Sequence, residues 1–318
     1  MTKLDPAAQS PVHIIVTCSN RKSDVVPDRL RMADLRGHTT GRRFTDWTQR
    51  LSTSTDPDRP AIDLYAGEHW QIARTLPLQI APRPATLWVC SAGYGLIAAH
   101  TPIQPYAATF AGGGLDSVGE DRTSAREWWT RLTQWPGPAR GEPRSFVDLA
   151  RRDPNATIIA VLSEAYQRAC AADIMAATQL LGDGEQMSVI GPATTELADV
   201  IVPVTARLQP LLGGSLLALN ARVAALLLSS AEDDQDLRRQ RLRARVEQST
   251  VSAPARAVRA AGQRMTDEEV RAFIGAHVEE PGVSATSLLR RLRQSGRSCE
   301  QGRFGQMFAE IAATAAGR

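Results

Sequence analysis

The residues best suited to chemistry form a polar segment directly after the first apolar run of the chain. The run His13–Cys18 is rich in β-branched residues, and Ser19, Asn20, Arg21 and Lys22 follow it. Hydroxyl and amide groups beside two cations suit an anion such as a phosphate group. A solvated surface loop is the alternative that the spacing leaves open.

A second candidate group lies at a predicted helix start within the segment Asp63–Trp70. Tyr65 and Gly67 precede Glu68 and His69, so an aromatic ring, a carboxylate and an imidazole lie close together. A carboxylate or an imidazole could orient a water molecule or protonate a leaving group. A structural role is the alternative, and for a lone histidine it is the more common outcome.

Further candidates follow other predicted strands or precede a predicted helix. Within Ser91–Leu96 two glycines permit close approach of the backbone to a ligand, and the tyrosine between them could stack on a flat ring. The pair Gly213-Gly214 would expose backbone N–H groups to an anion at the start of a helix. For Ser91–Leu96 the alternative is a plain turn with a packing tyrosine. For the helix after Gly214 the alternative is a buried Asn220 that caps a neighbouring loop. The candidate residues are Ser91, Gly93, Tyr94, Tyr106, Ser163, Gly214, Asn220 and Arg222.

An α/β domain is needed to bring these segments together. Short apolar runs at 13–18, 86–90, 157–162, 187–190 and 200–204 alternate with helical patterns. This alternation predicts one mostly parallel sheet with helices on both faces. In such a sheet ligands bind at the carboxyl ends of the strands, which is where the polar segments lie. The motifs GxGxxG and GxSxG are absent, so the sequence indicates neither a dinucleotide site nor a nucleophile elbow.

The charge pattern indicates a second domain. Residues 237–318 carry 15 arginines against 8 acidic residues, whereas residues 1–236 have a net charge of −4. We expect an α/β domain over 1–231, a charged helix and linker over 232–263, and a small helical domain of helix-turn-helix or winged-helix type over 264–318. Thr266–Glu269 predicts a capping box at its first helix. The arginines expected to contact DNA are Arg290, Arg291, Arg293, Arg297 and Arg303.

Composition excludes several other classes. The chain is 43% hydrophobic without a run of about 18 apolar residues or a leader pattern, so we expect a soluble, cytoplasmic protein. Its four cysteines are far apart, which favours neither a zinc site nor a disulfide framework, and we expect no metal and no cofactor. Every basic residue is an arginine except Lys3 and Lys22, which makes Lys22 conspicuous within its polar segment.

Four ordered motifs resemble bacterial and phage proteins of the DUF6884 and YaaA-like type. They are TCSNRK at 17–22, LYAGEHW at 64–70, SAGYGLI at 91–97 and PIQPYAATF at 102–110. The resemblance implies a relationship to the uracil-DNA-glycosylase superfamily and to base-exchanging tRNA enzymes, some members being associated with modified bases and phage defence. It therefore implies a nucleobase pocket. The short water-activating signatures of uracil glycosylases are not present, so the resemblance assigns no catalytic residue.

These observations lead to the hypothesis of a DNA glycosylase that flips a modified base, from phage DNA for example, out of the helix and excises it. The expected catalytic residues are Asn20, Glu68 and Asn220. We expect Tyr65 and Tyr94 to stack on the base, and Arg21, Lys22 and Arg222 to hold the flanking phosphates. The alternatives are a non-catalytic nucleic-acid-binding or stress-response protein, and a nucleoside or tRNA base-exchange enzyme.

Overall fold

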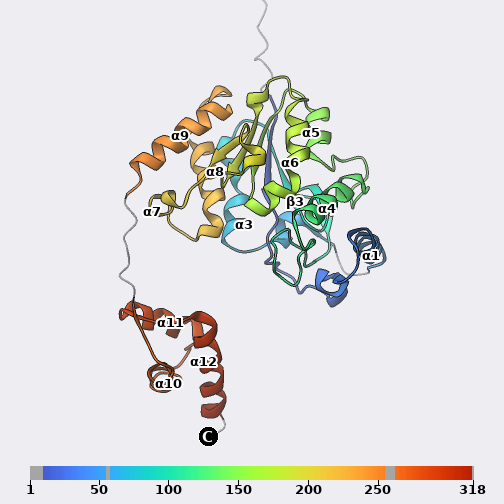
Figure 1. Ribbon diagram of the computed structural model, residues 1–318. Helices are drawn as coiled ribbons and strands as arrows, with labels where there is room; N and C mark the ends of the chain where they lie inside the picture. The colour runs from blue at the N-terminus through green and yellow to red at the C-terminus, as the bar shows by residue number, and fades with distance from the viewer. Residues whose placement is uncertain (1–9, 55–57, 255–261, 317–318) are drawn as a thin grey trace, which may run out of the picture. The chain divides into compact units, whose positions relative to one another are not determined.

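The computed structural model describes residues 10–54, 58–254 and 262–316, which belong to two compact units (Figure 1). The first unit extends to Ala255, and the second begins at Arg256. Each unit has its own hydrophobic core, as expected for two separate domains.

A six-stranded sheet forms the centre of the first unit. Its strand order is β4-β3-β1-β6-β7-β8, and every neighbouring pair is parallel except β3 and β4. Strands β1, β6 and β7 are buried along their whole length, as expected for β-branched parallel strands that are covered on both faces. The predicted mostly parallel α/β fold is thus confirmed. The strands are β1 (Val12–Thr17), β3 (Ala85–Ser91), β4 (Gly95–Ala98), β6 (Thr157–Val161), β7 (Met187–Gly191) and β8 (Ile201–Pro203).

Helices cover both faces of this sheet (Figure 1). Helices α4, α5 and α6 contact one another on one side, and α3, α8 and α9 lie on the other, with α8 against β6 and β7. The helices are α1 (Thr40–Thr53), α2 (Ala61–Leu64), α3 (Glu68–Ala73), α4 (Arg122–Gln134), α5 (Phe146–Arg152), α6 (Glu164–Thr178), α7 (Gln209–Leu212), α8 (Leu219–Ser229) and α9 (Arg239–Ser252). A two-stranded antiparallel pair, β2 (Arg59–Pro60) with β5 (Pro102–Ile103), lies beside them.

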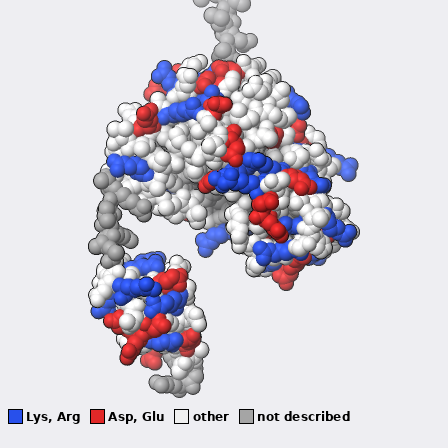
Figure 2. Space-filling view, viewed as in Figure 1, with Lys and Arg blue, Asp and Glu red and all other residues white. Residues whose placement is uncertain are grey.

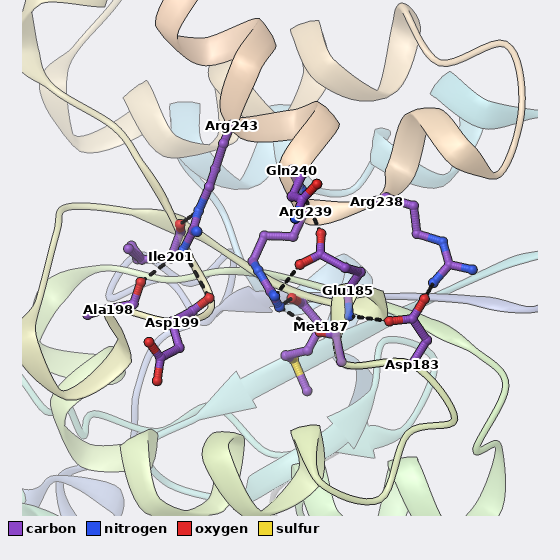
Figure 3. Close-up of polar contacts among 11 residues, drawn as sticks. Asp183, Glu185, Met187, Ala198, Asp199, Ile201, Arg238, Arg239, Gln240 and Arg243 are labelled. Carbon is purple, nitrogen blue, oxygen red and sulfur yellow. Dashed lines mark hydrogen bonds and ion pairs between the residues drawn. The ribbon is translucent and has the colours of Figure 1, made fainter.

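Helix α9 belongs to the first unit, which corrects the predicted boundary at 231. Leu242 and Val246 are buried in the main core, so α9 is not part of a free linker. Figure 3 shows arginines of α9 reaching the ends of the sheet strands. Arg239 pairs with Glu185 and donates to the carbonyl of Met187 at 3.0 Å. Arg243 donates to three carbonyls, those of Ile201, Ala198 and Asp199, at 2.6, 2.9 and 3.0 Å.

Over its described residues the second unit is helical, as predicted, with three helices and a short strand pair that the sequence did not indicate. Its elements are β9 (Gln263–Arg264), α10 (Asp267–Gly275), α11 (Ala285–Gln294), β10 (Arg297–Ser298) and α12 (Gln301–Ala316), with β9 and β10 parallel. The predicted capping box is present, because Thr266 and Glu269 bond each other's backbone N–H groups. Val270, Leu292 and Phe304 lie in a core common to all three helices.

Among the described residues, no single helix is long and apolar enough to cross a membrane. One bent pair of helices, Ala206–Leu212 and Leu216–Ser229, meets the length and composition requirement with a bend of 97°. The same residues contain no group of three or more histidine, cysteine, aspartate or glutamate side chains that could hold a metal ion.

Candidate functional site

The sheet topology defines the position at which a ligand is expected, the reversal between β1 and β6. The chain passes from β1 to β3 in one direction along the sheet and from β6 through β7 to β8 in the other. Ligands of open α/β sheets bind at such a reversal, outside the carboxyl ends of the strands. Three hydrogen bonds join elements there: Thr17 Oγ1 with His69 Nε2 at 3.2 Å, Cys18 Sγ with Tyr166 OH at 3.0 Å, and one from Asn220 Nδ2 to the Leu162 carbonyl at 3.1 Å.

His69 has an unused ring nitrogen at this end of the sheet. Its Nε2 lies 3.3 Å from the carbonyl oxygen of Thr17, which can only accept, so Nε2 carries the proton in this contact. Burial lowers the pKa of His69, which keeps the ring neutral. Nδ1 is buried and has no hydrogen-bond partner within the described parts of the chain. The ring therefore presents an acceptor that could orient a water molecule.

Lys22 lies against aromatic rings rather than projecting into solvent as a phosphate-binding side chain. Its Nζ donates to the Ser19 carbonyl at 2.8 Å and lies 4.3 Å from the ring centroid of Tyr106 and 5.5 Å from that of Tyr65. The residue is half-buried, and burial lowers its pKa to about 8. The predicted role of Lys22 in holding a flanking phosphate does not fit this position.

The tyrosines predicted to stack on a base are buried in the core. Tyr65, Tyr94 and Tyr106 are 2%, 3% and 0% exposed. The hydroxyls of Tyr65 and Tyr106 lie 2.9 Å apart, and Tyr106 OH lies 2.6 Å from Ser91 Oγ, while Tyr94 OH accepts from the Gln104 amide at 3.1 Å. This burial does not fit the stacking predicted for Tyr65 and Tyr94. Tyr65 and Tyr106 form a floor beneath Lys22, and the Ser91 hydroxyl bonds Tyr106.

Gly93 lies against this floor so closely that a side chain does not fit. A Cβ at this position would lie 2.5 Å from Cε2 of Tyr106 and 3.2 Å from the ring of Trp47. We expect Gly93→Ala to lower the free energy of unfolding by about 1–3 kcal/mol, because both rings are fully buried. Urea denaturation of the purified variant measures this. Gly112→Ala, where no atom lies within 4 Å of the added Cβ, is the control and should change stability by less than about 0.5 kcal/mol.

Glu68 and Arg222 form an ion pair, which changes the roles expected of both. Arg222 Nη2 lies 2.7 Å from Glu68 Oε1, and the Ser215 amide donates to the same oxygen at 3.2 Å. These contacts lower the pKa of Glu68, so the carboxylate is ionised at neutral pH. Gly214, with a φ of 70°, passes so close to the pair that a Cβ would collide with it. The charge of Arg222 is thus compensated, which argues against its predicted phosphate contact.

The ion pair anchors a segment that exposes three leucines. Leu211, Leu216 and Leu217 are 45%, 54% and 89% exposed; Leu211 belongs to α7, and the other two lie between α7 and α8. The short 3-10 helix Leu216–Ala218 contacts α3, the helix that begins with Glu68. We call these three residues the leucine lip.

The remaining predicted residues lie around the carboxyl ends of β1 and β6. Ser19 Oγ donates to the Ala66 carbonyl at 2.7 Å, and Gly67, with a φ of 95°, packs on the Arg21 side chain. Asn20, Arg21 and Ser163 are exposed. Asn220 bonds the described part of the chain through Nδ2, which leaves its Oδ1 without a partner there. The structure thus brings Ser19, Arg21 and Gly67 together and leaves Asn20 and Ser163 open to solvent.

Thr17, Cys18 and Tyr166 also lie at this reversal; Thr17 and Cys18 open the TCSNRK motif, but none of the three was a candidate site residue. Thr17 is the last residue of β1, and Tyr166 lies in the first turn of α6, the helix that follows β6. A search of the last residue of each strand and the first turn of each helix at a chain reversal would find Thr17 and Tyr166.

The second unit contains an arginine-lined groove with a volume of about 1080 Å³. Arg290, Arg293 and Arg297 line it with Thr286 and Gln301, and no acidic residue does. Two of the five arginines expected to contact DNA are instead engaged in ion pairs: Arg291 lies 2.9 Å from Glu280, and Arg303 pairs with Asp267. Figure 2 shows basic and acidic side chains side by side on the face of this unit that is in view.

Comparisons with protein-family models, with curated proteins and with solved structures find no match to this chain. The assignment of function therefore depends on the geometry of the two sites.

Proposed function

We propose that this protein is a DNA glycosylase that removes a modified base. The observation that carries the proposal is the neutral His69 ring at the end of β1, whose buried Nδ1 is unpaired within the described residues, together with Asn220, which bonds the Leu162 carbonyl after β6 through Nδ2 alone. Cleavage of an N-glycosidic bond needs a group that orients water and groups that bind the departing base. His69 Nδ1 orients the water, and Asn220 Oδ1 binds the departing base. Asn20, which is exposed, lies in the segment after β1.

Access to a base in duplex DNA requires that the nucleotide leave the stack. Exposed apolar side chains serve this purpose in proteins that unstack bases, and the leucine lip is of this type. Glu68 holds the lip through Ser215 and Arg222, so we assign it a positioning role rather than the catalytic role expected from the sequence. The arginine groove of the second unit, proposed as a helix-turn-helix or winged-helix module, supplies phosphate contacts.

The proposal includes a biological role for the enzyme. A cytoplasmic enzyme that excises a modified base suits defence against phage DNA that carries hypermodified cytosine or thymine. The resemblance to DUF6884 and YaaA-like proteins supports this, since some of those proteins are associated with phage defence. The proposed water attack uses neither a metal nor a cofactor.

The test is a panel of duplex DNAs: unmodified, uracil-containing and hypermodified. Mass spectrometry of the released base and alkaline cleavage of the strand both report on glycosylase activity. We expect base release from one class of DNA, and His69→Ala and Asn220→Ala should each lower its rate by about 10-fold to 1,000-fold. Glu68→Gln keeps the shape of the side chain but weakens the pair with Arg222, and it should raise KM more than it lowers kcat. Base release that is unchanged in both His69→Ala and Asn220→Ala would contradict the assignment.

A second candidate is a non-catalytic protein that binds nucleic acid and senses a modified base. It is favoured by the burial of Tyr65, Tyr94 and Tyr106, which leaves no ring among them to hold a flipped base. Binding to one modified DNA without base release would support this candidate over the glycosylase. A base-exchange enzyme would instead incorporate a labelled free base.

A further inference from the structure

Lys22 is the one lysine among the described residues, in a sequence whose only other lysine is Lys3. All other basic positions are arginine. An arginine carries the same charge but stays protonated in proteins, whereas a lysine amine can lose its proton and act as a nucleophile. A lysine at this one position in the segment after β1 therefore provides a chemical capacity that arginine lacks.

The surroundings of Lys22 favour the neutral amine. Nζ bonds one carbonyl oxygen and otherwise faces the rings of Tyr65 and Tyr106. No described carboxylate lies within ion-pair distance of it, and Asp116 and Cys18 act on it only from farther away. The phenols of Tyr65 and Tyr106 bond each other and Ser91. With a pKa of about 8, about a tenth of the side chains are neutral at pH 7 and about nine tenths at pH 9.

The position of Lys22 along the chain places it on the segment that directly follows Thr17, the partner of His69. It lies in the segment that follows β1, four residues after Cys18, and its backbone bridges to that of Tyr65 just before α3. His69 of α3 bonds Thr17, the last residue of β1. The amine and the imidazole are therefore carried by the same two segments at the carboxyl end of β1.

We propose that Lys22 forms an imine with C1′ of an abasic deoxyribose, the product of the proposed glycosylase reaction. The neutral amine attacks the aldehyde carbon of the ring-opened sugar. Two proton transfers then convert the carbonyl oxygen to water, which leaves as the C=N bond forms. The inference rests on the proposed function in that abasic DNA is its product.

The imine gives the protein a second activity, cleavage of the strand at the abasic site. Loss of a C2′ proton to water leaves an electron pair that forms a C1′–C2′ enamine or, with elimination, a C2′–C3′ double bond. The C3′–O bond breaks, and its electron pair leaves with the phosphate. Hydrolysis of the imine releases the unsaturated aldehyde and restores Lys22.

The experiment uses the full chain and a labelled duplex with one abasic site, made by removing a single uracil, so that no base release by this protein is needed. Sodium borohydride reduces an imine to a stable amine and so cross-links protein to DNA. We expect the wild type and Lys3→Arg to give equal yields of cross-linked protein. Lys22→Arg should give a yield at least tenfold lower. The wild-type yield should rise about tenfold from pH 7 to pH 9 as Lys22 loses its proton.

A direct readout does not depend on how the Lys22→Arg variant folds. After trypsin digestion of cross-linked wild type, the sugar adduct should lie on the peptide of residues 22–29, since a modified Lys22 resists cleavage. An adduct on Lys3 or on the terminal amine, equal trapping by Lys22→Arg, or binding of abasic DNA without trapping would each overturn the inference. Base release without trapping would leave the glycosylase proposal intact, whereas trapping without base release from any modified DNA would remove the glycosylase and leave the lyase.

Discussion

Replacing Arg290 and Arg297 together by alanine should weaken DNA binding by about 30-fold at moderate salt. Both side chains line the groove of the second unit, and neither has an acidic partner among the described residues. Each charge-assisted contact to a phosphate contributes about 1 kcal/mol, and two together correspond to about a 30-fold change. The slope of log affinity against log salt should become shallower by about 2, since two fewer counterions are released. Fluorescence anisotropy with a labelled duplex at several salt concentrations measures both quantities.

The matched control is the pair Arg291→Ala and Arg303→Ala, which changes the net charge of the chain by the same amount. Because Glu280 and Asp267 already compensate these two arginines, their removal should change affinity by less than about threefold. Equal losses in the two double variants would show that binding follows overall charge rather than the groove. No loss in either would remove the second unit from the DNA-binding surface.

Hydrophobic pattern and turn chemistry in the sequence were sufficient to predict the fold class. The apolar runs at 13–18, 86–90 and 157–162 are strands β1, β3 and β6, because a strand covered on both faces must be apolar throughout. The capping box at Thr266 is local and was likewise predicted. The charged helix expected within 232–263 is α9, but its packing on the sheet was not predicted, because that depends on tertiary contacts with β7 and β8.

The site was predicted at the level of segments but not of side chains. The polar stretch after β1 and the start of α3 do meet at the topological reversal. Which way each side chain points depends on packing, and Tyr65, Tyr94 and Tyr106 turn inward because their rings fill the core and their hydroxyls find partners there. The pairing of Glu68 with Arg222 joins residues 154 positions apart, which no local pattern reveals.

Arg239→Ala should lower the free energy of unfolding of the first unit by about 2–4 kcal/mol. The guanidinium is 13% exposed, pairs with Glu185 and donates to the carbonyls of Gly184 and Met187 (Figure 3). Alanine leaves that carboxylate with one backbone donor, Gln240, and leaves two carbonyls without this donor at the start of β7. For a domain of this size the expected fall in Tm is about 5–10 °C. Differential scanning calorimetry measures it.

Arg241→Ala is the control that separates the contacts of Arg239 from a general effect of charge on α9. Arg241 lies two residues further along the same helix, is exposed, and makes no hydrogen bond or ion pair with the described residues, so its removal should shift Tm by less than about 2 °C. Arg239→Lys keeps the charge but cannot bond Glu185 and both carbonyls with one planar group, and should fall between alanine and wild type. If Arg239→Ala melts with the wild type, the contacts of Arg239 with Glu185, Gly184 and Met187 contribute no net stability.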